Sequence, residues 1–232
     1  MITSVNFKIP HSMCDRFGNL SLRNLVGLMV ETSIIQAQEA EKNIDTKNLR
    51  RILYCRDIKI KETIKAEEEI KITTMPLEMD KFYCHRNFCV EKDGKILVKA
   101  YARFFILDIN RRRPIKASDE FKKAYSKEKA IYRPEKITYR DDFTNEKRIF
   151  VRNSDIDTNF HVNNAVYFDY ILDYLDIYSK DISYVNMVYK NEIRDKKSLL
   201  AESILYDNQI DFRLKSEDSK RIYTYGKIIK NV

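Results

Sequence analysis

Four polar side chains in the second half of the chain have the types and spacing for acid–base chemistry. Asp157, Asn159 and His161 alternate along one short segment, and Glu192 follows further along the chain. The imidazole of His161 can exchange a proton near neutral pH, and the two carboxylates can accept a proton or orient the imidazole. The Asn159 amide can both donate and accept a hydrogen bond. Together these groups could activate a water molecule and hold an oxyanion, the two requirements of acyl hydrolysis.

Each of these residues also has a purely structural interpretation. A lone histidine before a helix often serves as a turn or capping residue, and Glu192 could be a solvated residue on a strand. Asn163 and Asn164 fit the N-cap of the helix that follows, whose free backbone N–H groups could also face an oxyanion. Tyr167 fits core packing with its hydroxyl satisfied. For His161, the neighbouring polar residues from Asp157 to Asn164 favour the catalytic interpretation over the structural one.

The rest of the chain predicts two halves with the same order of elements. In each half a short extended segment and a polar turn precede one long helix, and strands with alternating apolar residues follow. The helices are expected over 20–42, with Ser21 as N-cap, and over 164–178. The expected strands are 52–60, 69–74, 83–91, 98–107, 184–192, 199–206, 210–214 and 221–229. Asp93 and Gly94 predict a hairpin turn between two of them.

One long helix against four or five strands in each half is an α+β arrangement, in which the antiparallel sheet must wrap the helix to bury both apolar faces. A charged stretch over 115–134 separates the halves. We therefore predict a first domain over 1–115, a linker over 116–136 and a second domain over 137–232.

The segment from Val151 to Tyr167 resembles the signature of the acyl-ACP thioesterases of plants and bacteria. In that family, Asp-x-Asn-x-His-Val-Asn-Asn-x-x-Tyr leads into the helix of the C-terminal hotdog domain. The matching positions are Asp157, Asn159, His161, Asn163, Asn164 and Tyr167. The stretch Val188–Glu192 is similar to the family's Glu-Tyr-Arg-Arg-Glu strand, which supplies a catalytic carboxylate. The stretch Phe105–Pro114 is similar to the end of the family's N-terminal hotdog.

The resemblance implies a double hotdog, with the acyl pocket in the first domain and catalysis in the second. It implies hydrolysis of fatty acyl-acyl carrier protein to a free fatty acid, which ends chain elongation. His161 and Glu192 would activate water, while Asp157 and Asn159 would position and polarise the substrate. No cofactor or metal is implied. No counterpart of the histidine motif is visible between Cys14 and Leu20, so we expect the first domain to select the acyl chain instead.

Three positions depart from the family pattern. Ile193 stands where plant members often carry a cysteine, and the second half has no cysteine, so a cysteine nucleophile there is excluded. Tyr170 and Phe104 stand where the family often has tryptophan, which we expect to reshape the acyl pocket. Asp173 replaces a commoner glutamate. The cysteines are Cys14, Cys55, Cys84 and Cys89, which we interpret as reduced structural thiols and not as a metal site.

The composition predicts a soluble cytoplasmic protein with an acidic partner. The formal charge is +8, which suits an acidic carrier protein. The cations are interleaved with acids, Arg111–Arg113 is the one tight cluster, and no nucleic-acid-binding motif accompanies it. No apolar run approaches the roughly 18 residues of a membrane span, and no secretory signal pattern is visible at the start. The chain could be a monomer or a homodimer.

Two other functions fit the same sequence. Many hotdog enzymes hydrolyse acyl-CoA, so an acyl-CoA thioesterase is the nearest alternative. A non-catalytic acyl-sensing hotdog protein is another, although it would not need the acid–base set. A hotdog dehydratase is disfavoured because its His/Asp or His/Glu motifs are not matched.

Overall fold

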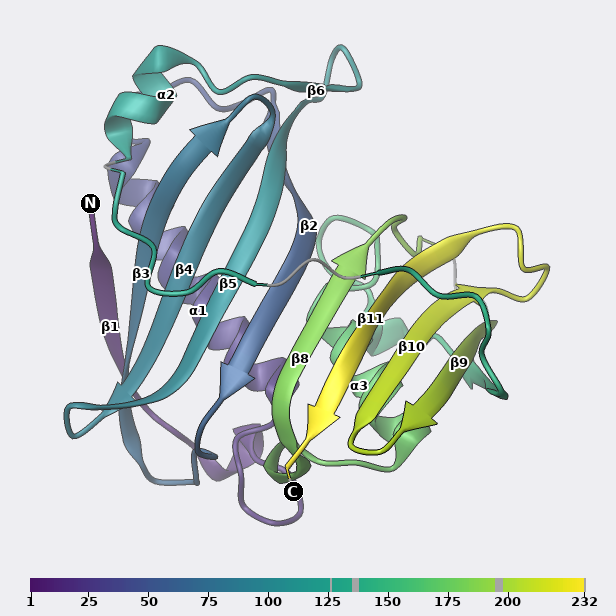
Figure 1. Ribbon diagram of the computed structural model, residues 1–232. Helices are drawn as coiled ribbons and strands as arrows, with labels where there is room; N and C mark the ends of the chain where they lie inside the picture. The colour runs from purple at the N-terminus through teal and green to yellow at the C-terminus, as the bar shows by residue number, and fades with distance from the viewer. Residues whose placement is uncertain (126, 135–137, 195–197, 232) are drawn as a thin grey trace.

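The computed structural model describes residues 1–125, 127–134, 138–194 and 198–231. Its strands form one continuous sheet in the order β1-β3-β4-β5-β2-β8-β11-β10-β9-β7, with β6 paired to β5. Helices α1 and α3 lie behind this sheet in the view of Figure 1. None of the helices in the described ranges has the length and apolarity needed to span a lipid bilayer.

The first half contains one long helix and most of the strands around it. Helix α1 has Ser21 as its N-cap, whose hydroxyl accepts a hydrogen bond from the Asn24 backbone N–H at 3.3 Å, as predicted. Asp93 and Gly94 both have positive φ, 50° and 76°, so the turn between β4 and β5 is the expected tight hairpin. The elements are β1 Thr3–Lys8, α1 Leu22–Ala40, β2 Leu49–Ile60, β3 Glu69–Asp80, β4 Tyr83–Lys92, β5 Lys95–Asp108, β6 Arg113–Ile115 and α2 Asp119–Ala124.

The second half repeats this plan with a shorter helix. Its elements are β7 Asn145–Phe150, a 3₁₀ helix Asn153–Asp155, α3 Val166–Leu175, a 3₁₀ helix Ser179–Asp181, β8 Ile182–Tyr189, β9 Ser198–Tyr206, β10 Gln209–Ser216 and β11 Ile222–Lys230. Helix α3 ends earlier than predicted because Asp176 adopts the left-handed conformation, with φ 53°. The two helix-and-sheet units confirm the predicted double hotdog.

Strands β2 and β8 join the two halves at the middle of the sheet. They pair antiparallel from Cys55 opposite Val188 to Lys59 opposite Tyr184. On the helical side, Arg23 of α1 forms an ion pair with Asp169 of α3 at 2.9 Å. Apolar residues of both helices and both sets of strands belong to one buried cluster. The halves therefore share a core as well as a sheet.

The connector between the halves crosses the other face of the sheet (Figure 1). The Asn87 amide donates to the carbonyl of Tyr132 at 2.9 Å. The Tyr132 hydroxyl donates to Asp57, which also accepts hydrogen bonds from the Tyr184 hydroxyl and the Asn186 amide. Asp57 is fully buried, and this burial raises the pKa of its carboxyl despite the three donors. The Asp57 cluster thus ties the connector to strands of both halves.

The predicted strand end at residue 192 differs from the structure, and the boundary between the predicted linker and second domain lies outside the described residues. Strand β8 ends at Tyr189, so the prediction that a strand continues to residue 192 was wrong. The predicted linker end at 136 and the predicted domain start at 137 lie outside the described residues. The division into 1–115, 116–136 and 137–232 stays a prediction.

Candidate active site

The loop that carries the predicted histidine is a small hairpin. The Asp157 N–H donates to the His161 carbonyl at 2.9 Å, and the Phe160 N–H donates to the Asp157 carbonyl at 3.0 Å. Ile156 and Val162 form an antiparallel bridge at its base. Phe160 takes the left-handed conformation, with φ 61°, at the tip. Asp157 and His161 are therefore held opposite one another.

Asp155 anchors this hairpin to helix α3. Its buried carboxylate accepts hydrogen bonds from the Arg152 N–H at 2.7 Å and from the Tyr170 hydroxyl at 2.6 Å. Burial would raise the pKa of Asp155, but these hydrogen bonds hold it below its usual value. Sequence reasoning missed this residue. The signal was Tyr170, whose buried hydroxyl needs a hydrogen-bond partner.

The structure brings the four predicted site residues together around the imidazole. Nδ1 of His161 lies 3.6 Å from Oδ2 of Asp157, and Nε2 lies 4.0 Å from Oε1 of Glu192. The other carboxylate oxygen of Glu192 accepts two hydrogen bonds from Arg194. The Asn159 N–H donates to Oδ1 of Asp157 at 2.8 Å. The two imidazole distances exceed a direct hydrogen bond, as is common for catalytic groups before substrate binds.

Glu192 lies on an irregular segment beyond β8, and backbone contacts hold this segment against the hairpin. The Val162 N–H donates to the Ile193 carbonyl at 2.8 Å, and the Ile193 N–H donates to the Tyr167 hydroxyl at 3.3 Å. The Tyr189 hydroxyl donates to the Asn164 carbonyl at 3.0 Å. Tyr167 is buried with its hydroxyl satisfied, as predicted. Glu192 is thereby positioned without a regular strand.

The site opens into a large cavity between α1 and the sheet. Its volume is about 1140 Å³, and all four predicted site residues line it. The α1 wall contains Val26, Gly27, Val30, Ser33, Ile34 and Ala37. Met29 of the same helix is fully buried in the core and is not among the residues that line the cavity. The apolar wall suits an acyl chain.

The start of α3 offers fewer free donors than we expected. The side-chain oxygen of Asn163 accepts a hydrogen bond from the Ala165 N–H at 2.9 Å, and its carbonyl accepts one from the Val166 N–H at 2.9 Å. The N-cap of α3 is Ala165, which has no capping side chain, so the prediction that Asn163 and Asn164 cap this helix was wrong; Asn163 closes the turn before it. Asn159 also lines the cavity, and the role of its amide in polarising the substrate stays a prediction.

The first half contains a structural counterpart of the hairpin. The Asp15 N–H donates to the Asn19 carbonyl at 2.7 Å, Gly18 has φ 77°, and the Leu20 N–H donates to the Ile64 carbonyl at 2.7 Å. These bonds repeat those of Asp157, His161 and Val162. The expectation of no counterpart in this region was therefore wrong for the backbone.

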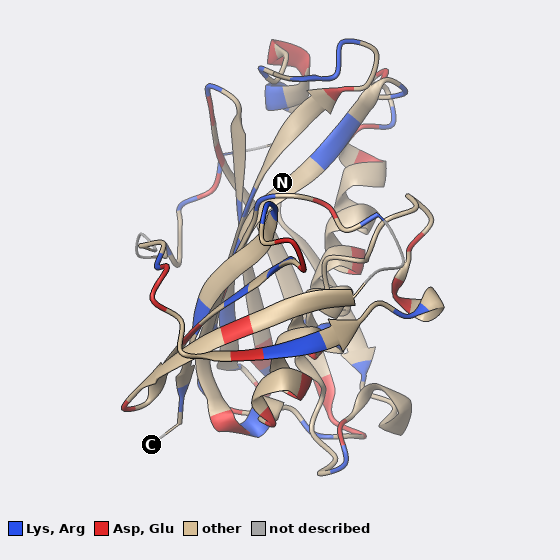
Figure 2. Ribbon diagram, turned by 90° about the vertical axis from the view of Figure 1, so that its right-hand side faces the viewer, with Lys and Arg blue, Asp and Glu red and all other residues tan. Residues whose placement is uncertain are grey.

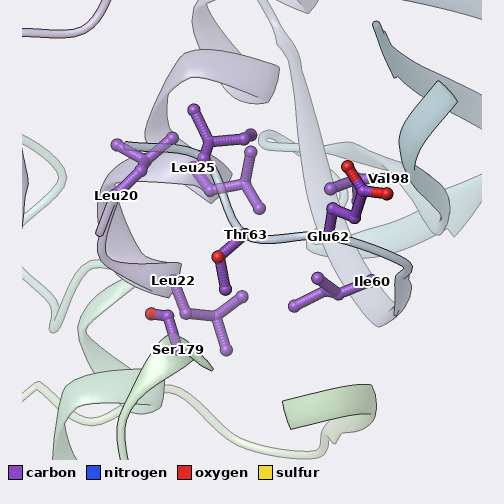
Figure 3. Close-up of a pocket in the computed structure, with 9 residues that line it drawn as sticks. Leu20, Leu22, Leu25, Ile60, Glu62, Thr63, Val98 and Ser179 are labelled. Atoms are coloured by element: carbon purple, nitrogen blue, oxygen red, sulfur yellow. The ribbon is translucent and has the colours of Figure 1, made fainter. Parts of the chain in front are cut away.

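The counterpart keeps a carboxylate, Asp15, in the place of Asp157, but it lacks the histidine, the equivalent of Glu192 and the space. Asn19 occupies the place of His161, and Thr63 occupies the place of Glu192. Figure 3 shows the apolar side chains that surround Thr63, and the cavity there is only about 10 Å³. Such a space barely admits one water molecule. The two equivalent places therefore differ: one opens into the large cavity and carries His161 and Glu192, and the other has almost no space.

Comparison with known proteins supports a single family. Residues 2–125 match the family model of the acyl-ACP thioesterase N-terminal domain, and residues 138–231 match that of the acyl-ACP thioesterase C-terminal domain. No curated protein sequence matches the chain.

Solved structures show the same fold at low identity. An acyl-ACP thioesterase from Bacteroides thetaiotaomicron superposes with a TM-score of 0.85 at 20% identity, covering 99% of this chain and 98% of its own. A 12:0-ACP thioesterase from Umbellularia californica superposes with a TM-score of 0.86 at 14% identity, covering 99% and 97%. A Staphylococcus aureus protein in complex with CoA covers 60% of this chain and 96% of its own, with a TM-score of 0.52 at 10% identity.

Proposed function

The chain belongs to the acyl-ACP thioesterase family, and on that premise we propose that it hydrolyses the thioester of fatty acyl-acyl carrier protein to a free fatty acid. The observation that carries this proposal is one cavity of about 1140 Å³. It combines an acid–base group at one end with a long wall of apolar residues. An acyl chain can lie along that wall while its thioester reaches His161 and Glu192.

The arrangement around His161 suits the activation of a water molecule. A water between Glu192 and the thioester would lose a proton to the carboxylate or the imidazole as its oxygen bonds to the carbonyl carbon. The tetrahedral intermediate then collapses, the carbon–sulfur bond breaks, and the thiolate takes the proton. Asp157 lies on the opposite side of the imidazole and orients it. The Asn159 amide is the donor we assign to the oxyanion.

Exposed cations at the cavity suit an acidic carrier protein. Arg50 and Lys190 are exposed residues of the cavity lining, and Pro114, next to the Arg111–Arg113 cluster, also lines it. Figure 2 shows cations and acids interleaved over the rest of the molecule. The cations at the cavity therefore support an acidic carrier protein as the partner, since opposite charges raise encounter rates.

The proposal is tested by supplying matched acyl-acyl carrier protein and acyl-CoA panels and following the release of free thiol. We expect hydrolysis of both classes, with a higher kcat/KM for the carrier-protein substrate of the same chain length. The reverse preference would assign the protein to acyl-CoA. Binding of acyl groups without release of thiol would identify a non-catalytic acyl sensor.

A further inference from the structure

Two arginines and one alanine form a row across the concave face of the sheet. Ala102 of β5 lies opposite Arg86 of β4 on one side and opposite Arg56 of β2 on the other. Residues in register on neighbouring strands point to the same face of a sheet. All three line the large cavity. The cavity wall that is otherwise apolar therefore contains two guanidinium groups on either side of a small residue.

This row lies near the limit of the cavity along β2 and β5. On β2 the described lining residues reach Arg56 but include none of 57–60, and on β5 they reach Ala102 but not Ala100, while on β4 they continue past Arg86 to Phe88. Arg56 pairs with Met187 of β8, and Glu192 follows further along that chain. Strand β8 ends at Tyr189, two residues after Met187, and Glu192 lies beyond that end in the irregular segment. The arginine row thus lies on the sheet wall, and the acid–base residues lie beyond the end of β8.

Arg56 differs from Arg86 in its hydrogen bonding, although its guanidinium lies 6.0 Å from the centre of the Phe88 ring. It is 4% exposed, and neither its Nε nor its Nη1 has a hydrogen-bond acceptor among the described residues. Burial accordingly lowers the pKa of Arg56. Arg86, in contrast, donates to the Thr74 hydroxyl at 2.7 Å and to Gln36. A buried cation with unsatisfied donors is rare unless water or a ligand satisfies them.

An acyl chain that reached Arg56 would cover the part of this guanidinium that is still accessible and offer no hydrogen-bond acceptor in exchange. The chain gains by burying each methylene along the apolar wall, but this gain ends where a guanidinium must be desolvated. We propose that Arg56 is a specificity residue that limits the length of the acyl chain. This inference deepens the proposed function and rests on it.

The experiment compares Arg56→Met with Arg56→Lys. Both replacements shorten the side chain to a similar size, but only lysine keeps a charge. We expect the wild-type protein to show a kcat/KM that falls beyond one chain length in a series of saturated acyl thioesters. Arg56→Met should raise kcat/KM for the next longer even-numbered chain by about tenfold relative to that optimum, the scale of a methylene discrimination. Arg56→Lys should keep the wild-type limit.

Lys59→Met, an exposed position on the same strand outside the cavity, is the matched control for removing a cation of β2. An equal shift in the lysine and methionine variants would show that side-chain size sets the limit and would overturn the inference. An unchanged limit in folded Arg56→Met would overturn it too. If the wild type hydrolyses no thioester, the proposed function fails separately. The limit is then read from the rise in Tm with free fatty acids of increasing length, compared between the same variants.

Discussion

Nε2 of His161 lies 4.0 Å from Oε1 of Glu192, although the two residues lie in separate segments of the chain. His161 belongs to the hairpin before α3, and Glu192 lies beyond the end of β8. The hydrogen bond from the Val162 N–H to the Ile193 carbonyl joins the next residue of each segment at 2.8 Å. A backbone hydrogen bond therefore holds the two segments that carry the catalytic candidates next to each other.

Removal of either group should abolish most of the activity. His161→Ala and Glu192→Ala should each lower kcat by about 10²-fold or more, because each removes a group that transfers a proton or directs the water. Thr63→Ala changes the equivalent position of the first half and should leave kcat unchanged. The measurement is thiol release at saturating substrate. Full activity in folded His161→Ala would exclude the assignment.

Replacement of all four cysteines by serine should leave turnover intact in a protein that still folds. None of them lines the large cavity. Burial raises the pKa of the Cys84 thiol to about 11, so it carries little thiolate at neutral pH. Since Cys55, Cys84 and Cys89 are buried, the variant should have a lower Tm. Loss of kcat with a native circular dichroism spectrum would show that a thiol takes part in the reaction.

Enlargement of the α1 wall should shorten the preferred acyl chain. Val26→Phe places an aromatic ring into the cavity, so the optimum in kcat/KM should move to shorter chains. Met29→Phe enlarges a fully buried core residue instead, and overpacking there should cost about 1–3 kcal/mol of stability without moving the optimum. Acyl-chain panels and thermal unfolding separate the two results. A shift caused by Met29→Phe alone would place the pocket on another face of α1.

Salt should weaken the reaction with the carrier protein more than the reaction with a small thioester. The Debye length falls from about 10 Å at 0.1 M to about 3 Å at 1 M salt, which screens attraction between oppositely charged proteins. At subsaturating substrate, kcat/KM for acyl-acyl carrier protein should therefore fall steeply. An acyl-N-acetylcysteamine thioester, which lacks the protein surface, should change little. Equal salt dependence for the two substrates would refute electrostatic steering.

The cluster Arg111–Arg113 is the first place to test for docking. Reversal of these residues to glutamate should raise KM for acyl-acyl carrier protein and leave the small thioester unaffected. Lys227, a cation of β11 in the second half that does not line the cavity, provides a control when reversed to glutamate. An unchanged KM in the cluster variant would place docking elsewhere on the surface.

The buried Asp57 should make stability depend on pH. Its pKa is raised in the folded protein, while the unfolded chain ionises near its ordinary value of about 3.9. The stability that the protonated carboxyl contributes is present below that value and is lost as pH rises through the folded pKa. The free energy of unfolding of Asp57→Asn minus that of the wild type should therefore increase between about pH 4 and pH 7. A difference that stays constant with pH would contradict the shift.

The order and type of the elements could be predicted from the sequence because they follow from local patterns. Ser21 caps α1 through its own hydroxyl, and Asp93–Gly94 accept the positive φ that a tight turn needs. The candidate site residues could be identified because the hairpin, with its alternating polar side chains, lies within one short segment. Their contact with Glu192 was an expectation from resemblance, since it depends on how two distant segments pack.

Features set by tertiary packing could not be predicted. Glu192 lies outside the predicted strand because the segment after Tyr189 loses the regular pairing with β11: the N–H groups of Lys190 and Asn191 both donate to the Tyr223 carbonyl, and Ile193, the residue after Glu192, bonds to the hairpin. In the sequence, Arg56 and Arg86 are charged residues of two separate strands. Only the strand register, in which both lie opposite Ala102, shows that they share a face. The closed counterpart of the site in the first half was hidden because Asn19 and Thr63 share no chemistry with His161 and Glu192.

The pairing of β2 with β8 has a consequence for dividing or recombining the protein. If either half were expressed alone, its central strand would become a long sheet edge with unpaired backbone groups and an uncovered apolar face, conditions that promote aggregation. Chimeras that exchange one half between relatives must therefore preserve the register between Cys55 and Val188 and the Asp57 cluster on the reverse face. Recombination points are better placed in the loops between strands than in the connector, although the charged composition of the connector suggests it as a domain boundary.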